Sequence, residues 1–109
     1  MSDWAAIEAE IDRIIERSGA FESETIAQVR DFLRLIRGRC PVPKVAKGYW
    51  STISFYWDET VGGPIEVEVF ADRLEVYRFF DQRTDIRHTA HAPGEAFPSE
   101  FVSGLPLLP

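Results

Sequence analysis

The sequence predicts a single α+β domain over residues 1–109, in which an N-terminal α-hairpin packs on an antiparallel sheet of about four strands and a short C-terminal helical turn follows. Two patterns carry this prediction. Apolar residues recur three and four positions apart before residue 38, as in amphipathic helices, and alternate with polar residues from residue 49 onward, as in strands. At 109 residues, 45% of them hydrophobic, the chain is long enough to bury one core.

Two helices are expected in the first third of the chain. The first begins at Ser2 or Asp3 and ends at Gly19, and the second begins at Ser23 and ends at Gly38. Their apolar stripes consist of Trp4, Ile7, Ile11, Ile14 and Ile15 in the first and Ile26, Val29, Leu33 and Ile36 in the second. Because the joint between them is short, we expect an antiparallel hairpin that covers the sheet.

A connector that cannot be helical follows the second helix. Pro41 and Pro43 fix their own φ angles and favour extended geometry before them, so we expect residues 39–48 to run as polyproline II along the surface. Strands are predicted over residues 49–57, 65–70, 74–80 and 86–92, the last of them at an edge because it is the least apolar. Residues 99–103 are expected to form a helical turn that ends at Gly104.

The net charge of −6 argues against nucleic acid as the partner, because binding to phosphates requires clustered Lys and Arg. Residues 1–29 contain seven acids and two bases, residues 30–47 one acid and six bases, and residues 48–109 ten acids and four bases. We expect the basic segment to pair with its acidic neighbours. The alternative is that Arg30, Arg34 and Arg37, which share one face of the second helix, bind an anion.

The cysteine content and the N-terminus indicate a compartment. The single Cys40 cannot form an internal disulfide and fits a reducing environment, where it is expected to be a small packed residue. The N-terminal run MSDWAAIEAEIDRII has neither the basic region of a signal peptide nor the uninterrupted apolar stretch of a membrane span. We therefore infer a cytoplasmic protein without a membrane partner.

The sequence contains no enzyme motif such as a P-loop, GxSxG or HExxH. His88 and His91, the two histidines, are three positions apart, which places them on opposite faces of a strand, so no metal site is predicted. We expect no catalytic residue and no cofactor. A small enzyme that holds an anionic substrate with the arginine row is the less favoured alternative.

The outer face of the predicted sheet carries the most informative group of side chains. Alternation places Glu66, Glu68, Glu75 and Tyr77 on this face, together with Trp50 and Tyr56. Acids interleaved with Trp and Tyr are typical of a surface that binds a basic protein, because the aromatic rings anchor and the acids steer the partner. The predicted partner-binding residues are Trp50, Tyr56, Asp58, Glu66, Glu68, Glu75 and Tyr77. The alternative is a solvated face whose aromatics reflect strand propensity.

The layout resembles that of the small acidic bacterial immunity proteins and antitoxins that neutralise a cognate toxin. The resemblance covers size, charge and element order, with Pro41, Pro43, Gly48 and Trp57 as its fixed points. It implies a non-enzymatic inhibitor whose partner is a basic toxin or nuclease domain. The alternative is a structural or assembly module, a homodimer formed through the C-terminal leucines and the edge strand near Ile86.

Overall fold

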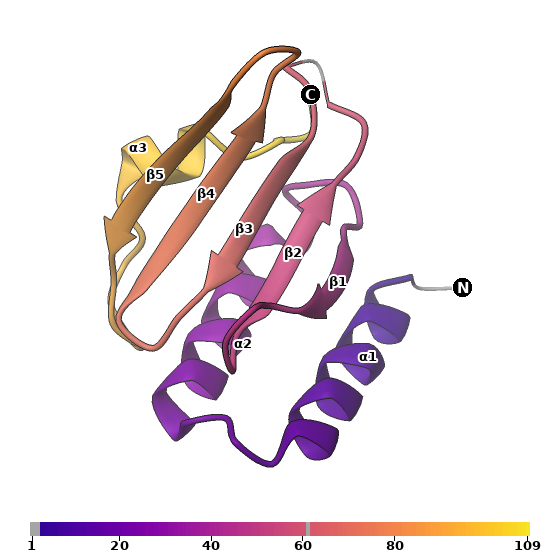
Figure 1. The fold of residues 1–109 in the computed structure, drawn as a ribbon, viewed down its shortest axis with the longest axis vertical. Helices are drawn as coiled ribbons and strands as arrows, with labels where there is room; N and C mark the ends of the chain where they lie inside the picture. Colours follow the sequence, from indigo (N-terminus) through magenta and orange to yellow (C-terminus); the bar gives the residue numbers. More distant parts are fainter. Residues whose placement is uncertain (1–2, 61) are drawn as a thin grey trace.

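The computed structural model describes residues 3–60 and 62–109 and confirms the α+β fold class (Figure 1). Its elements are α1 (Asp3–Ser18), α2 (Ser23–Ile36), β1 (Lys44–Lys47), β2 (Ile53–Trp57), β3 (Ile65–Val69), β4 (Arg73–Phe79), β5 (Thr84–Ala90) and α3 (Ser99–Ser103). The strands form one antiparallel sheet in the order β1-β2-β3-β4-β5. The described sheet therefore has five strands, and the prediction of about four is corrected.

The additional strand, β1, lies in the proline-containing connector. Lys44 pairs with Tyr56 and Lys47 with Ile53, so this part of the connector joins the sheet and is not the surface polyproline II segment that was predicted. The physical reason is that none of the four residues Lys44–Lys47 is a proline, so each has a backbone N–H and can pair with the open edge of β2. The connector was therefore predicted correctly as non-helical but wrongly as unpaired.

The strand predicted to begin at residue 49 begins at Ile53. The backbone N–H of Gly48 donates to the carbonyl of Thr52 (2.9 Å), which closes a turn between β1 and β2. Tyr49, Trp50 and Ser51 lie within this turn and do not continue the alternation of β2. The prediction that they alternate between the two sheet faces is wrong, because the turn reverses the chain before the strand starts.

The helices end near the predicted glycines. Gly19 has a φ of 63° and directly follows α1, so it adopts the left-handed conformation that glycine accommodates most easily. α2 ends at Ile36, two residues before Gly38. The start of α1 agrees with a first helical residue at Asp3, whereas Ser2, the other predicted start, lies outside the described residues.

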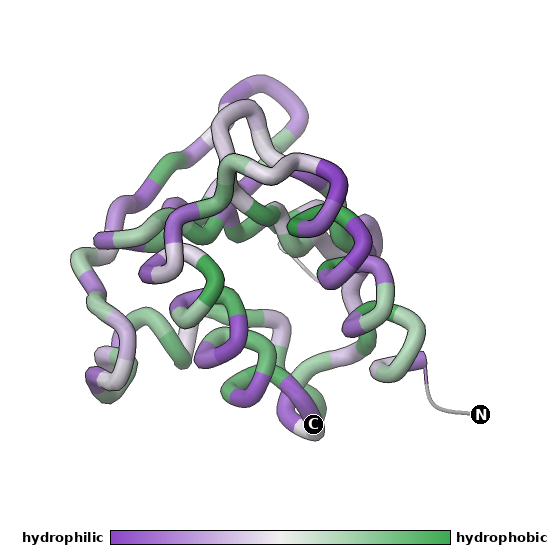
Figure 2. The backbone as a smooth tube through the Cα atoms, turned by 90° about the horizontal axis from the view of Figure 1, so that it is seen from below, coloured by the Kyte–Doolittle hydropathy of each residue, from purple (hydrophilic) through white to green (hydrophobic). Residues whose placement is uncertain are grey.

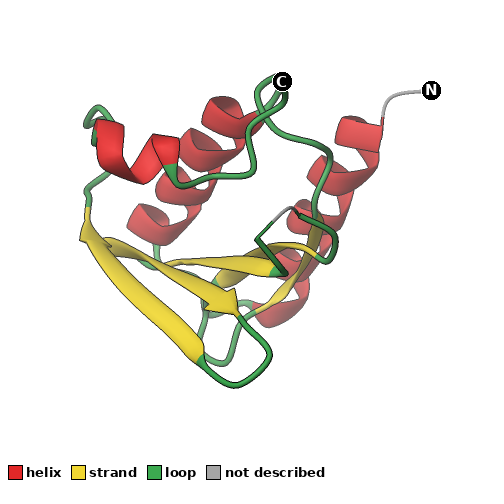
Figure 3. Ribbon diagram, turned by 90° about the horizontal axis from the view of Figure 1, so that it is seen from above, coloured by secondary structure: helices red, strands yellow, loops and turns green. Residues whose placement is uncertain are grey.

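All three helices lie on one side of the sheet. Hydrophobic and hydrophilic residues alternate along the helices and the strands (Figure 2), and the helices together form one layer above the sheet (Figure 3). The sheet buries the side chains that face this layer: Ile53, Phe55, Trp57, Ile65, Val67, Val69, Leu74 and Val76. These positions alternate with Tyr56, Glu66, Glu68, Glu75 and Tyr77, which were predicted to lie on the outer face. The opposite face of the sheet is consequently left without a helical cover in the described chain.

Phe32 of α2 occupies the centre of the core. Its side chain is fully buried, and its ring packs edge-on against Phe55 of β2 with 4.9 Å between the ring centroids. Phe97 and Phe101 lie 6.4 and 6.0 Å from it, also edge-on. Aromatic pairs of this geometry contribute beyond the area they bury. One side chain of α2 therefore joins the helical layer to the sheet and to the C-terminal segment.

Replacing Phe32 with Ala should lower the free energy of unfolding by about 3–5 kcal/mol, because the cavity lies among rings from three segments. Urea denaturation followed by circular dichroism measures this loss. Phe80→Ala is the matched control, since Phe80 is 39% exposed and should cost less than about 1 kcal/mol. Similar losses in the two variants would contradict the central position of Phe32.

Candidate binding surface

The outer face of the sheet carries two rows of side chains that run across the strands. The first, the outer row, consists of Lys44, Tyr56, Glu66, Tyr77 and Ile86. The second row, which lies on the same outer face, consists of Ala46, Ser54, Glu68, Glu75 and His88. The register thus brings together five of the seven predicted partner-binding residues on one face.

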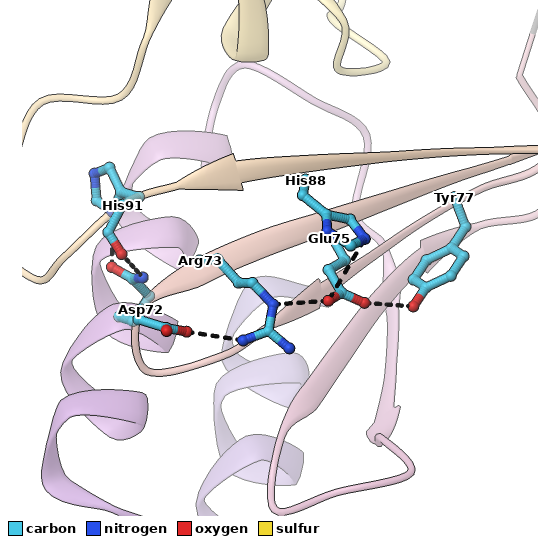
Figure 4. A network of polar contacts seen from close by, with 7 residues as sticks. Asp72, Arg73, Glu75, Tyr77, His88 and His91 are labelled. Carbon is cyan, nitrogen blue, oxygen red and sulfur yellow. Dashed lines mark hydrogen bonds and ion pairs between the residues drawn. The ribbon is translucent and has the colours of Figure 1, made fainter.

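Glu75 is the centre of a polar network on this face (Figure 4). The hydroxyl of Tyr77 donates to Oε1 of Glu75 (2.7 Å), and Nε of Arg73 donates to Oε2 (2.7 Å). Nε2 of His88 lies 3.8 Å from the same Oε2. Arg73 also pairs with Asp72 (2.9 Å). Glu75 is only 8% exposed, and the groups that contact its carboxylate all belong to the same chain.

The network sets the charge states of Glu75 and Tyr77. Burial alone would raise the pKa of Glu75, but the hydrogen bonds from Tyr77 and Arg73 outweigh burial, and the pKa of Glu75 is lowered. Burial and the hydrogen bond to Glu75 both raise the pKa of Tyr77. At neutral pH, Glu75 is therefore an anion and Tyr77 a neutral phenol, which fixes the direction of the hydrogen bond between them.

Glu68 and Glu66 are held by hydroxyl groups of β2 and of the turn before it. Oγ1 of Thr52 donates to Oε2 of Glu68 (2.5 Å), and Oγ of Ser54 donates to Oε2 of Glu66 (3.1 Å). A Cβ at Gly48 would stand 2.0 Å from Oγ1 of Thr52 and 2.5 Å from Oε2 of Glu68. The position of Gly48 therefore requires glycine, because the buried Glu68 carboxylate packs against its backbone. Glu66 remains part-exposed.

Trp50 and Asp58 lie apart from the two rows. The indole of Trp50 is 63% exposed in the β1–β2 turn, with its ring centroid 4.9 Å from that of Tyr49. Asp58 follows β2 at its opposite end and pairs with Lys44 (2.7 Å). Trp50 therefore keeps the exposure that was expected of it, at the border of the surface, and Asp58 is occupied by a lysine of the same chain.

The arginine row of α2 is paired with carboxylates. Arg30 pairs with Asp12 and Arg37 with Glu8 of α1, the latter at 3.8 Å, while Arg34 pairs with Asp31 on α2. Together with the pair between Lys44 and Asp58, this confirms pairing with the acidic neighbouring segments for three of the six bases between residues 30 and 47, whereas Arg34 pairs within its own segment. The ion pairs between α1 and α2 also hold the helical hairpin together, although exposed pairs of this kind contribute little each.

The two histidines face different surroundings. His88 lies on the outer face, whereas His91 is buried against α2, where its Nδ1 lies 2.7 Å from Oε1 of Gln28. The His91 ring also stacks on Phe97, with 4.0 Å between centroids. Pattern reasoning missed this buried contact, because only the path of the chain after β5 brings His91 to Gln28. Within the described residues, no group of three or more His, Cys, Asp or Glu is arranged to hold a metal.

No protein-family model, curated protein or solved structure matches this chain. None of the helices in the described ranges is both long and apolar enough to cross a membrane. The functional assignment therefore depends on the geometry of the surface.

The lowered pKa of Glu75 predicts an acid-sensitive contribution to stability. This contribution is complete above the ordinary glutamate pKa of 4.5 and is lost as the pH falls through the lower folded-state value. Glu75→Gln should therefore be less stable at neutral pH, by about 1–3 kcal/mol, and should lose less stability than the wild type on acidification. Urea denaturation across the acid range measures both. Glu66→Gln is the matched control with a part-exposed carboxylate, and identical acid profiles for wild type and Glu75→Gln would contradict the network.

Cys40 should be unreactive in the folded chain. Burial raises the pKa of its thiol from the ordinary 9.0 to about 11, so little thiolate is present at neutral pH. We expect a colorimetric thiol reagent to label the native protein at least about a hundredfold more slowly than the urea-unfolded protein. Equal rates in the two states would show that the thiol is not buried in the folded protein.

Proposed function

We propose that this is a non-enzymatic protein-binding protein that engages a basic protein through the open face of its sheet. One observation carries the proposal: the register aligns Tyr56, Glu66 and Tyr77 as direct neighbours on β2, β3 and β4. All three side chains are part-exposed. Two aromatic rings on either side of a carboxylate offer both apolar contact area and a site for a partner's Lys or Arg.

The buried acids prepare this surface for binding. Glu75 holds the Tyr77 hydroxyl, and both Glu75 and Glu68 are too deeply buried to contact a partner directly. Their charge nevertheless adds to the negative potential around Glu66, the more accessible of the three carboxylates. A side chain that is already fixed loses little conformational entropy on binding, so this arrangement favours affinity.

The β1–β2 turn supplies a second anchor at one end of the same surface. Trp50 lines a hollow of about 530 Å³ together with Phe70 of the β3–β4 turn and Arg73 at the start of β4, and Glu22 and Asp72 contribute acids to its lining. Exposed tryptophan beside carboxylates is suited to a long basic side chain, whose stem packs on the indole while its charge meets the acids. The surface thus extends from Ile86 to the turn that contains Trp50.

The role that fits this surface best is inhibition of a toxin, in the manner of an immunity protein or antitoxin. The basic active site of a toxin or nuclease domain matches an acidic face, and the chain carries a net charge of −6. Complementary charge raises the association rate, and an inhibitor of a lethal enzyme has to bind that enzyme quickly. A cytoplasmic location belongs to the same proposal.

A second candidate, self-association, is favoured by the position of Ile86. This residue is 52% exposed on the edge strand β5, beside whose outer side no strand of the described residues lies. Two copies could pair these edges in an antiparallel ladder. Solution mass separates the two candidates: a dimer that Ile86→Lys converts to a monomer supports self-association, and a monomeric wild type excludes it.

A charge reversal on the outer row tests the binding function. Glu66→Lys should weaken binding to the basic protein that the wild type captures from its host lysate by at least about tenfold, because it places a cation between the two tyrosines. Isothermal titration at rising salt concentration measures the affinity, which should fall as charges are screened.

The matched control is Glu16→Lys, which makes the same change of charge at an exposed position of α1. This variant should bind like the wild type. Equal effects of the two reversals would mean that net charge alone governs binding, and an unchanged affinity of Glu66→Lys would exclude the sheet face as the interface.

A further inference from the structure

Arg78 of β4 is a part-buried cation that has no carboxylate partner among residues 3–60 and 62–109. Arg30, Arg73 and Arg78 are the part-buried arginines among the described residues, and the first two form ion pairs. Arg78 instead donates from Nη2 to the backbone carbonyl of Gly104. Within the described chain no carboxylate lies within 4.0 Å of its guanidinium. A guanidinium that is partly removed from water without a counter-charge is costly, which indicates a place for an anion.

The acids around Arg78 do not supply this counter-charge: Glu100 lines a second hollow with Arg78 and forms no ion pair with it. Asp85 lies opposite Arg78 in the pairing of β4 with β5, but its carboxylate is 3.9 Å from Nε of Arg87. Glu59 lines the same groove as Arg78 and forms no ion pair with it. Among the described residues, the other N–H groups of the Arg78 guanidinium have no hydrogen-bond acceptor, so they can donate to a ligand.

The guanidinium borders a groove of about 900 Å³ between the β2–β3 loop and the C-terminal segment. A Cβ at Gly62 would stand 3.7 Å from Nη1, and one at Gly104 would stand 3.5 Å from Nη2. The two glycines therefore flank the guanidinium with no side chain of their own in the way. The apolar lining consists of Pro41, Ile65, Leu105, Pro106 and Leu107. The volume is within the usual range for small-molecule sites.

We infer that this groove binds a small carboxylate that carries an aliphatic chain. The planar guanidinium matches a carboxylate in a two-point hydrogen-bonded geometry, and the apolar lining buries the chain. A bare inorganic anion would leave the apolar lining unused. Arg78 pairs with Ile65 on the helix side of the sheet, so this site is separate from the proposed protein-binding face and does not depend on it.

Three small probes test the inference on the intact protein: hexanoate, hexanamide and acetate. Hexanoate should produce saturable shifts of the amide NMR signals around residues 62–65 and 103–107. Hexanamide, which lacks the charge, and acetate, which lacks the chain, should each bind at least about tenfold more weakly. Shifts that do not saturate, shifts confined to other residues, or equal affinity for hexanamide would overturn the inference.

Two substitutions test the charged part and the apolar part of the site separately. Arg78→Gln should weaken hexanoate binding at least about tenfold, whereas Arg83→Gln, at an exposed arginine that stacks on Phe80 (4.6 Å), should leave it unchanged. Because Arg78→Gln also removes the bond to Gly104, Leu107→Asp provides a second test at a side chain that is 44% exposed. Leu107→Asp should also weaken binding about tenfold. Unchanged hexanoate affinity in Leu107→Asp, or in a folded Arg78→Gln, would contradict the site.

Discussion

The packing around Phe32 is the contact on which the rest of the structure depends. Its ring meets Phe55 of β2, Phe97 before α3 and Phe101 within α3, so one α2 side chain contacts both the sheet and the C-terminal segment, which are distant in sequence. A two-layer domain of this size has a single core, and here the core lies entirely on the helix side of the sheet. The outer face is consequently free to carry polar and aromatic side chains that the core does not need.

Polar contacts complement this core at two places on opposite sides of the sheet. On the outer face, the Glu75 carboxylate accepts hydrogen bonds from Tyr77 and Arg73, and on the inner side the Gln28 amide meets both the ring and the backbone of His91. In the described part of the chain, every buried side-chain nitrogen or oxygen has a partner. Satisfied networks of this kind favour one register over its neighbours, because a slip by one residue would break several bonds at once.

The sequence predicts the strands and their faces well because alternation is a local property. Glu66 and Tyr77 were expected on one face, and the register makes them direct neighbours. The β1 strand was missed because four residues of the pattern KVAK carry a weak signal, and its pairing depends on the free edge of β2. Trp50 was misplaced for a related reason, since the turn that Gly48 closes cannot be read from alternation.

Ion pairing is harder to predict, because it depends on the path of the whole chain. Arg37 belongs to a clustered row in the sequence and Arg78 does not, yet Arg37 lies beside Glu8 of α1, whereas Arg78 bonds to the carbonyl of Gly104 after α3 and has no carboxylate partner among the described residues. Whether an arginine is paired with a carboxylate, as in the row on α2, or bonds only to a backbone carbonyl, as Arg78 does, depends on how the helices are arranged. The arginine inferred to bind a carboxylate, Arg78, is therefore not a member of the clustered row Arg30, Arg34 and Arg37.

An amide NMR map of the complex is the decisive test of the proposal that the uncovered sheet face binds a basic protein. With the captured partner bound, we expect the signals of β2, β3 and β4 around Tyr56, Glu66 and Tyr77 to shift, together with those of the turn that contains Trp50. The exposed surfaces of α1 and α2 should remain unchanged. Shifts confined to the helical layer, with the sheet signals unmoved, would contradict the account.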